Sequence, residues 1–340
     1  MADRSTRRKK PSLAEVAEIA GVSISTVSKV ANGSVDVSDV TRERVERILS
    51  ERGYVATKKR RGSLMPVAIL ARDMHSPYTL DVIRGAVDAA GPVQVDVTVA
   101  RHPDDAADLR WIDEIHAAGR RGIIAITSML DEAQRARVAH HGLALVVIDA
   151  VNNPDEATFS VGATNWAGGL GATEHLLDLG HRDVAMLSGL PQTMASRARV
   201  SGYRAALNGF EGDHAPARVL PGDFTYDSGL ELGAQLLAGK ARPTAIFAAS
   251  DFQALGVLEA ARRAGLRVPE DLSVVGFDDL IMAQMSSPQL TSVRQPLEQM
   301  GATAVETIVA LLGGATGRPH HTELATRLVV RGSTAPPPER

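Results

Sequence analysis

The sequence predicts a small all-α domain of the helix-turn-helix type, followed by a larger α/β core in which helices flank parallel sheets. Capped amphipathic segments crowd the first 50 residues, and from Val67 onward apolar strand-like runs alternate with helical stretches. Charge divides the chain at the same place. Residues 1–61 carry 14 basic and 8 acidic side chains, a net charge of +6, whereas residues 62–340 carry 23 and 32, a net charge of −9.

The helix-turn-helix pattern lies in residues 13–32. Ser12 and Glu15 have the spacing of a capping box for the first helix, Gly21 can reverse the chain, and Ser23 can cap the second helix. With the valines facing inward, the second helix exposes Ile24, Ser25, Ser28, Lys29 and Asn32. Short polar side chains followed by a cation suit the floor of a DNA major groove.

The same two-helix pattern also occurs in proteins that never touch DNA. The basic clusters at residues 7–10 and 58–61 flank the motif as phosphate-contacting ends would, and they favour the DNA interpretation. A third helix is expected at 39–52, capped by Ser38, with Val40, Val45, Ile48 and Leu49 facing inward. Residues 1–56 are therefore predicted to form the helix-turn-helix domain, 57–65 a linker and 66–340 the core.

The core is expected to contain two lobes that divide near residue 160, because about 270 residues exceed one sheet of usual size. The expected strands are Val67–Ala71, Val93–Ala100, Gly122–Thr127, Ala144–Asp149, Asp183–Ser188, Ala245–Ala249, Leu272–Gly276 and Arg327–Val330. The expected helices are Pro77–Ala90, Asp105–Ala118, Trp166–Leu179, Arg199–Phe210 and Phe252–Ala264. The proline-rich end, residues 333–340, is expected to be disordered.

Several classes of function are not favoured by the residues. The chain has no cysteine, which excludes disulfides and thiolate chemistry, and no apolar run approaches the length of a membrane span. Among the histidines, His102 and the pairs at 140–141 and 320–321 lack metal-ligand spacing and are interpreted as surface residues. The adjacent Asp278 and Asp279 make a poor acid/base pair, and the glycine-rich run at 168–171 lacks dinucleotide spacing. We expect a cytoplasmic, nucleoid-associated protein that is not an enzyme and has no cofactor, metal or membrane partner.

Several motifs together resemble the lactose-repressor (LacI/GalR) family of bacterial transcription regulators. They include VAEIAGVSISTVSKVANG, EHLLDLGHRDVAMLSG, RVSGYRAAL and PEDLSVVGFDD, in the order and spacing of that family, and the resemblance covers about residues 11–333. It implies a helix-turn-helix domain, a hinge and a core similar to periplasmic sugar-binding proteins, assembled as a homodimer, with a tetramer left open. It also implies three crossings between lobes, with lobe one at about 66–160 and 292–322 and lobe two at about 161–291 and 323–333.

The resemblance also implies roles for individual residues of the DNA-binding domain. Ile24, Ser25 and Lys29 would read base edges from a recognition helix that begins at Ser23. Phosphates would be held by Ser12, Thr26, Ser28 and Asn32. One departure is the hinge, VATKKRRGSLMP, which is shorter than usual and lacks the hinge-helix signature. Leu64, or basic residues such as Lys58 and Arg60, would then reach the minor groove.

Polar residues directly follow several of the expected strands. In doubly wound sheets, ligands bind at the carboxyl ends of the strands. These residues are Ser128, Asp149, Ser250, Asp251 and Asp278. A helix cap is the competing interpretation of Asp251, and a helix cap or solvated loop that of Asp279. The family's ligand contacts carry over to Tyr78, Asp149, Arg199, Phe224, Ser250, Asp278 and Gln295.

Carboxylates and a guanidinium that bridge hydroxyls, beside two aromatic rings, favour a sugar over a purine in a chain with only 4% aromatic residues. The expected function is repression of carbohydrate-utilisation genes on operator DNA, switched by xylose or by a xylo- or cello-oligosaccharide. The alternatives are a sugar- or nucleobase-binding module and a regulator that activates.

Overall fold

The computed structural model describes residues 13–31, 37–51, 64–102, 108–128, 130–152, 157–239 and 241–339. The chain divides into two compact units, Met1–Leu64 and Met65–Arg340. No helix among the described residues is long and apolar enough to cross a membrane. Of the predicted linker at 57–65, residues 57–63 lie outside the described residues, and Met65 already belongs to the first strand of the core.

The first unit is a three-helix cluster of α1 (Leu13–Ala20), α2 (Ile24–Ala31) and α3 (Asp39–Glu51). Its core consists of Val16, Ala17, Ala20, Val27, Val30, Val45 and Leu49, with Val22 and Ile48 packed against them. Gly21 adopts a φ of +64°, which lets the chain reverse between α1 and α2. The prediction that Val40 faces inward is wrong: it lies in the first turn of α3, is 70% exposed and does not belong to the helical core.

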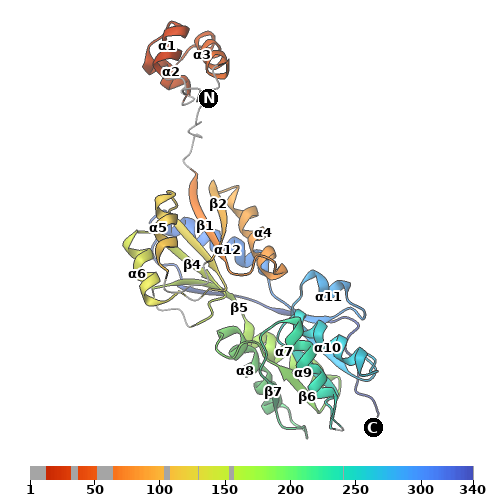
Figure 1. Ribbon diagram of the computed structural model, residues 1–340. Helices are drawn as coiled ribbons and strands as arrows, with labels where there is room; N and C mark the ends of the chain where they lie inside the picture. Colours follow the sequence, from red (N-terminus) through yellow and green to blue (C-terminus); the bar gives the residue numbers. More distant parts are fainter. Residues whose placement is uncertain are drawn as a thin grey trace, which may run out of the picture. The chain divides into compact units, whose positions relative to one another are not determined.

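The second unit contains two six-stranded sheets (Figure 1). The first has the order β11-β5-β4-β3-β1-β2, and all its strands are parallel. The strands of this sheet are β1 (Met65–Ala71), β2 (Val95–Arg101), β3 (Gly122–Ile126), β4 (Ala144–Ile148), β5 (Phe159–Ala163) and β11 (His321–Leu324).

The second sheet has the order β12-β10-β9-β8-β6-β7, and only β12 runs antiparallel to its neighbour. Its strands are β6 (Val184–Leu187), β7 (Arg218–Leu220), β8 (Ala245–Ala248), β9 (Ser273–Asp278), β10 (Thr291–Arg294) and β12 (Arg327–Val329). Sequence patterns missed β5, β7, β10 and β11, because these strands are short and carry polar or half-exposed residues.

Helices cover both faces of each sheet, as the alternation of side chains along a strand requires. In the first lobe, Ile124 and Ile126 of β3 face α4 (Pro77–Ala90) and α12 (Leu297–Leu312), whereas Ile123 faces α5 (Arg110–Ala117) and α6 (Glu132–His140). In the second lobe, one face packs on α7 (Asn165–Asp178) and α8 (Met194–Gly209) and the other on α9 (Tyr226–Leu237) and α10 (Asp251–Arg263). The short helix α11 (Ile281–Met285) follows β9. The sequence analysis did not identify α6, α9, α11 or α12.

Glycines allow three of these helix pairs to pack closely. A Cβ on Gly169 would lie 2.4 Å from the carbonyl oxygen of Arg199, and one on Gly202 would lie 2.2 Å from that of Trp166. The pairs Gly85/Gly301 and Gly229/Gly256 have the same arrangement. The glycine-rich run at the start of α7 therefore serves helix packing.

The chain crosses between the lobes three times, after β5, β10 and β11. In Figure 1, α12, drawn blue, lies among the orange and yellow elements of the first lobe. Three expected boundaries require correction. Residues 161–163 were assigned to lobe two, but they belong to β5, which pairs with β4 and β11 in the first sheet. Residues 292–294 were assigned to lobe one, but β10 pairs with β9 in the second sheet; residues 323–324 were assigned to lobe two, but β11 pairs with β5 in the first.

The expectation of a disordered end at 333–340 is wrong for its described part. Ser333 is fully buried, and its hydroxyl donates to the carbonyl of Val274 at 2.6 Å. The backbone N–H of Thr291 donates to the same hydroxyl at 2.8 Å, and the N–H of Ala335 donates to Ser273 Oγ at 3.0 Å. These bonds to β9 and the start of β10 hold the segment on the second lobe despite its prolines.

Candidate functional site

The exposed face of α2 carries most of the predicted DNA-contacting side chains that the structure describes. Ser23 caps the helix, since its Oγ accepts the N–H of Thr26 at 3.1 Å. Ile24 is 55% exposed, and Ser25 and Lys29 are also exposed. Thr26 and Ser28 are half-buried. The predicted contacts Ser12, Asn32, Lys58 and Arg60 lie outside the described residues.

A cavity of about 560 Å³ lies in the second unit, lined by residues of both lobes. Six of the predicted ligand residues line it: Tyr78, Asp149, Arg199, Phe224, Ser250 and Asp278. Tyr78 stands at the start of α4, and Asp149 and Asp278 lie at the carboxyl ends of β4 and β9. The cavity therefore occupies the position where doubly wound sheets bind ligands.

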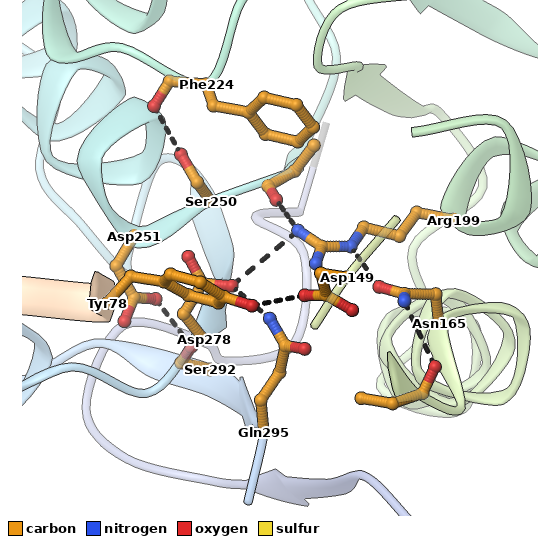
Figure 2. A network of polar contacts seen from close by, with 12 residues as sticks. Tyr78, Asp149, Asn165, Arg199, Phe224, Ser250, Asp251, Asp278, Ser292 and Gln295 are labelled. Atoms are coloured by element: carbon orange, nitrogen blue, oxygen red, sulfur yellow. Dashed lines mark hydrogen bonds and ion pairs between the residues drawn. The ribbon is translucent and has the colours of Figure 1, made fainter. Parts of the chain in front are cut away.

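Tyr78, Asp149, Asp278 and Gln295 form a polar network around the guanidinium of Arg199 (Figure 2). The Tyr78 hydroxyl donates to Asp149 Oδ2, and Gln295 Nε2 donates to Asp278 Oδ1 at 2.7 Å. Arg199 Nη1 lies 3.7 Å from Asp278 Oδ1. The network thus joins a tyrosine and a carboxylate of the first lobe to an arginine and a carboxylate of the second.

Arg199 is fixed by the protein on several sides. Its Nε donates to Asn165 Oδ1 at 2.8 Å, and its Nη1 donates to the carbonyl of Ala249. Its guanidinium carbon lies 3.6 Å from the centroid of the Phe277 ring and 5.7 Å from that of Phe224. The side chain is only 4% exposed. The cation is therefore held in place before any ligand arrives.

Burial dominates the electrostatics of these groups. It raises the pKa of Asp278 to about 6, although Arg199 and Gln295 oppose the shift. Burial likewise raises the pKa of Asp149, against the hydrogen bond from Tyr78 and the charge of Arg199. The pKa of Tyr78 is also raised, first by burial and then by Asp149. At neutral pH the Tyr78 hydroxyl keeps its proton and acts as a donor.

Backbone strain is concentrated at the edge of the cavity. Thr127, Asp149, Phe224 and Asp278 line it with φ angles of +46°, +47°, +72° and +107°. L-residues rarely adopt this region, and such strain clusters at binding sites. Here it turns side chains at the ends of strands towards the cavity.

Three predicted ligand residues do not line the cavity. Ser128 is buried and donates to the carbonyl of Ile126 at 3.0 Å. Asp251 is fully buried behind Asp278, where its carboxylate accepts the N–H of Leu280 at 2.7 Å and the hydroxyl of Ser292 at 2.5 Å. Gln295 reaches the cavity only through its hydrogen bond to Asp278. Asp251 and Gln295 therefore position Leu280 and the carboxylate of Asp278, which line the cavity.

Ser250 combines two functions. Its hydroxyl donates to the carbonyl of Phe224 at 2.7 Å, and its Oγ accepts the N–H of Gln253 as the N-cap of α10. Asp279 is neither a helix cap nor solvated: its side chain is fully buried in ion pairs with Arg294 at 2.5 Å and Arg331 at 2.6 Å. His102 is likewise not a surface residue, being 3% exposed beside Trp111.

Sequence reasoning missed several residues that line the cavity. They include Asp73, Ser76, Thr127, Thr193, Asp223, Tyr226, Asp227, Phe252 and Leu280. Asp73 follows β1 by two residues, so the rule of strand ends would have found it had it been applied to that strand. Asp223 follows β7, which the sequence analysis did not identify. Leu280 and Phe252 of the second lobe also pack against the apolar core of the first.

Comparisons with known proteins find related proteins for both units of the chain. The family model "Bacterial regulatory proteins, lacI family" matches residues 12–56, and "Periplasmic binding protein-like domain" matches residues 173–334. The transcriptional regulator CelR of Thermobifida fusca is 34% identical over 344 aligned positions, which cover 96% of this chain and 99% of CelR.

Solved structures of transcriptional regulators are also similar to this chain. A CelR–cellobiose complex superposes with a TM-score of 0.71 at 34% identity, over 95% of this chain and 99% of that chain. A Lac repressor dimer bound to operator and the anti-inducer ONPF superposes with a TM-score of 0.81 at 28% identity, over 96% and 100%. With a helix-turn-helix unit, a periplasmic-binding-protein-like core and a relative this similar over nearly its full length, the chain belongs to the lacI family of bacterial transcriptional regulators.

Proposed function

We propose that this protein is a repressor of carbohydrate-utilisation genes, whose affinity for operator DNA is switched by a small sugar bound between the two lobes of the core. The observation that carries the proposal is the cavity of about 560 Å³, into which both lobes direct carboxylates, a guanidinium and aromatic rings. A ligand that contacts groups of both lobes stabilises one relative arrangement of them.

The exposed face of α2 supports the DNA-binding half of the proposal. Lys29 can donate to guanine, Ser25 can donate or accept, and Ile24 suits a thymine methyl group. Phosphate contacts from Ser12, Thr26, Ser28 and Asn32, and from Lys58 and Arg60 in the linker, would position the helix in the groove.

The chemistry of the cavity supports a saccharide as the effector. Carboxylate oxygens can accept from neighbouring sugar hydroxyls, and the rings of Tyr78 and Phe224 offer apolar faces to a pyranose. We favour cellobiose or a longer cello-oligosaccharide, because CelR is similar to this chain and a CelR–cellobiose complex shares its fold. Xylose and xylo-oligosaccharides, which have related rings, are the next candidates.

The switch we propose requires a homodimer that places two recognition helices on a near-palindromic site. Exposed apolar side chains, among them Leu80 and Val87 of α4 and Ile281 and Met285 of α11, are available for contact with a second copy. Closure of the lobes on a sugar would move the DNA-binding units out of register. Because such coupling is reciprocal, operator DNA should weaken sugar binding by the same factor.

The test is binding of the full-length protein to fragments of the region upstream of its own gene, at two salt concentrations. Each fragment is titrated with and without cellobiose, xylobiose, xylose and galactose. We expect salt-sensitive binding to one fragment that one sugar abolishes. Sugar that strengthens operator binding would contradict release by the effector and indicate a corepressor. No preference over random DNA under any condition would contradict the regulator and favour a sugar-binding module.

A further inference from the structure

The charges around the cavity are strongly unbalanced. Five aspartates line it, Asp73, Asp149, Asp223, Asp227 and Asp278, and Arg199 is the single cation among the lining residues that the structure describes. Two of the N–H groups of Arg199 are already donated to Asn165 and Ala249. The single cation is therefore committed largely to the protein, and the carboxylates that line the cavity outnumber it five to one.

Hydrogen-bond acceptors also outnumber donors in the polar network. Asp149 and Asp278 provide four carboxylate oxygens, of which Oδ2 of Asp149 accepts from Tyr78 and Oδ1 of Asp278 accepts from Gln295. Gln295 Oε1 has no hydrogen-bond donor within the described part of the chain, but Gln295 does not line the cavity, so the carboxylates of Asp149 and Asp278 are the acceptors of this network that a ligand can reach. Buried acceptors are costly without donors. A ligand that fits this cavity must supply donors.

Three of the aspartates are exposed residues of the cavity rim that belong to both lobes. Asp73 precedes α4, and its Oδ1 accepts the N–H of His75 at 2.8 Å. Asp223 precedes α9, and its Oδ1 accepts the N–H of Thr225 at 2.9 Å and the Thr225 hydroxyl at 2.6 Å. Asp227 lies in the first turn of α9. Hydrogen bonds hold the carboxylates of Asp73 and Asp223, and all three residues place a carboxylate where a ligand enters.

Hydrogen bonds favour the ionised form of Asp223 at the rim. Burial would raise the pKa of Asp223, but hydrogen bonds from Thr225 and Ser228 outweigh it and leave the pKa below the usual value. An ionised carboxylate or phosphate on a ligand is an acceptor only, so it would bring no donor and would meet like charge.

We infer that the effector is a sugar bearing hydroxyl or amine donors and no anionic group, and that Asp73, Asp223 and Asp227 are specificity-determining residues that reject uronic acids and sugar phosphates. This inference rests on the proposed function, because it concerns the same cavity. It adds a selection by charge that neither the fold nor the size of the cavity requires.

Matched pairs of sugars test the inference by isothermal titration calorimetry on the full-length protein. Each pair shares its ring configuration and differs by a carboxylate: cellobiose with cellobiuronic acid, xylose with glucuronic acid, and galactose with galacturonic acid. In any pair that binds, we expect the acid to bind at least about tenfold more weakly, by a factor that shrinks as salt is added. An acid that binds as tightly as its neutral partner overturns the inference but leaves the proposed function standing. Failure of every sugar, with operator binding intact, overturns both.

The variant D73N/D223N/D227N tests whether the three rim aspartates are the residues that select against acidic sugars. Asparagine keeps an oxygen that can accept the turn hydrogen bonds and removes only the charge. We expect the affinity ratio between the neutral and the acidic sugar to fall severalfold in this variant. The matched control, E211Q/E231Q/E306Q, removes three exposed charges that do not line the cavity and should keep the wild-type ratio. Equal ratios in the rim variant and the wild type would contradict the assignment of these residues.

Discussion

The exposed face of α2 and the polar network of the cavity hold their functional side chains in opposite ways. On α2, Ile24, Ser25 and Lys29 project from a helix whose other face is packed, and their exposure means that little else depends on them. In the cavity, Arg199 and Asp278 are buried and form an ion pair, and the half-buried Asp149 accepts a hydrogen bond from Tyr78. We therefore expect mutations on α2 to affect binding without affecting folding, and mutations in the cavity to affect both.

The largest effect is expected from Arg199→Ala. Removing the guanidinium leaves Asp278 buried without its cation and breaks the bonds to Asn165 and Ala249, so the free energy of unfolding should fall by about 3–5 kcal/mol. Urea unfolding followed by circular dichroism measures it. Arg204→Ala, an exposed arginine on the same helix, is the control and should change stability by less than about 0.5 kcal/mol. Equal losses in both variants would contradict the coupling of binding and folding in the cavity.

His181 extends the comparison to a buried polar site outside the cavity. Burial lowers its pKa to about 4, and its ring contacts Thr244 and Ser273. Between pH 6.5 and 4 the unfolded chain binds a proton that the folded chain does not, so this residue's contribution to stability should be lost as pH falls. The loss should reach about 3 kcal/mol.

The measurement for His181 is the free energy of unfolding against pH, in the wild type and in His181→Gln. Asp278 acts in the opposite direction in part of this range, because its pKa is raised to about 6, but it is common to both proteins. The difference between the two curves therefore isolates His181. Parallel curves would mean that the histidine titrates normally in the folded protein.

Lys29→Ala tests the other side of the comparison. Operator affinity should fall by about 1–3 kcal/mol, whereas random-DNA affinity and thermal stability should change little, because the side chain is exposed. Fluorescence anisotropy with operator and scrambled duplexes measures the two affinities. Arg47→Ala, an exposed cation on α3, controls for loss of charge alone. A clear drop in melting temperature would show that Lys29 contributes to folding as well as to DNA binding.

Tyr78→Phe should lower both the free energy of unfolding and the affinity for sugar, each by a smaller amount. It deletes the hydroxyl that donates to Asp149 and should lower stability by about 1 kcal/mol. Sugar affinity, measured by calorimetry, should weaken as well, because the unpaired carboxylate is no longer held in position. A loss of sugar affinity with unchanged stability would show that this hydrogen bond contributes nothing to folding.

The smallest effect is expected for Val40→Ala. Although its place in the helical pattern predicted burial, Val40 is 70% exposed, and truncating an exposed side chain should alter the unfolding free energy by less than about 0.5 kcal/mol. Val45→Ala, on the buried face of the same helix, is the contrasting variant and should cost several times more. Thermal unfolding of the two proteins makes the comparison.

Local patterns predicted most of the elements that carry the sites. The expected helix at 77–90 coincides with α4, and the cap at Ser23 is present. Polar residues at strand ends identified Asp149, Ser250 and Asp278, which line the cavity. The same rule placed Ser128 and Asp251 in the site wrongly, because one strand end delivers neighbouring side chains to the cavity and to the interior alike.

What the sequence by itself determined was the periodic part of the protein: three amphipathic helices, a basic first unit, and an alternation of strands and helices that requires layered parallel sheets. These features depend on residues a few positions apart, so local chemistry suffices. Only the tertiary structure decided the rest. Residues 321–324 pair with β5 and residues 333–335 form hydrogen bonds to β9, both far away in the chain, and Arg199 meets Asp278 across 79 positions. The pairing of distant strands, and the number of hydrogen-bond donors and acceptors in the cavity, depend on which distant residues the fold brings together. The spacing of residues along a single helix or strand carries no information about that.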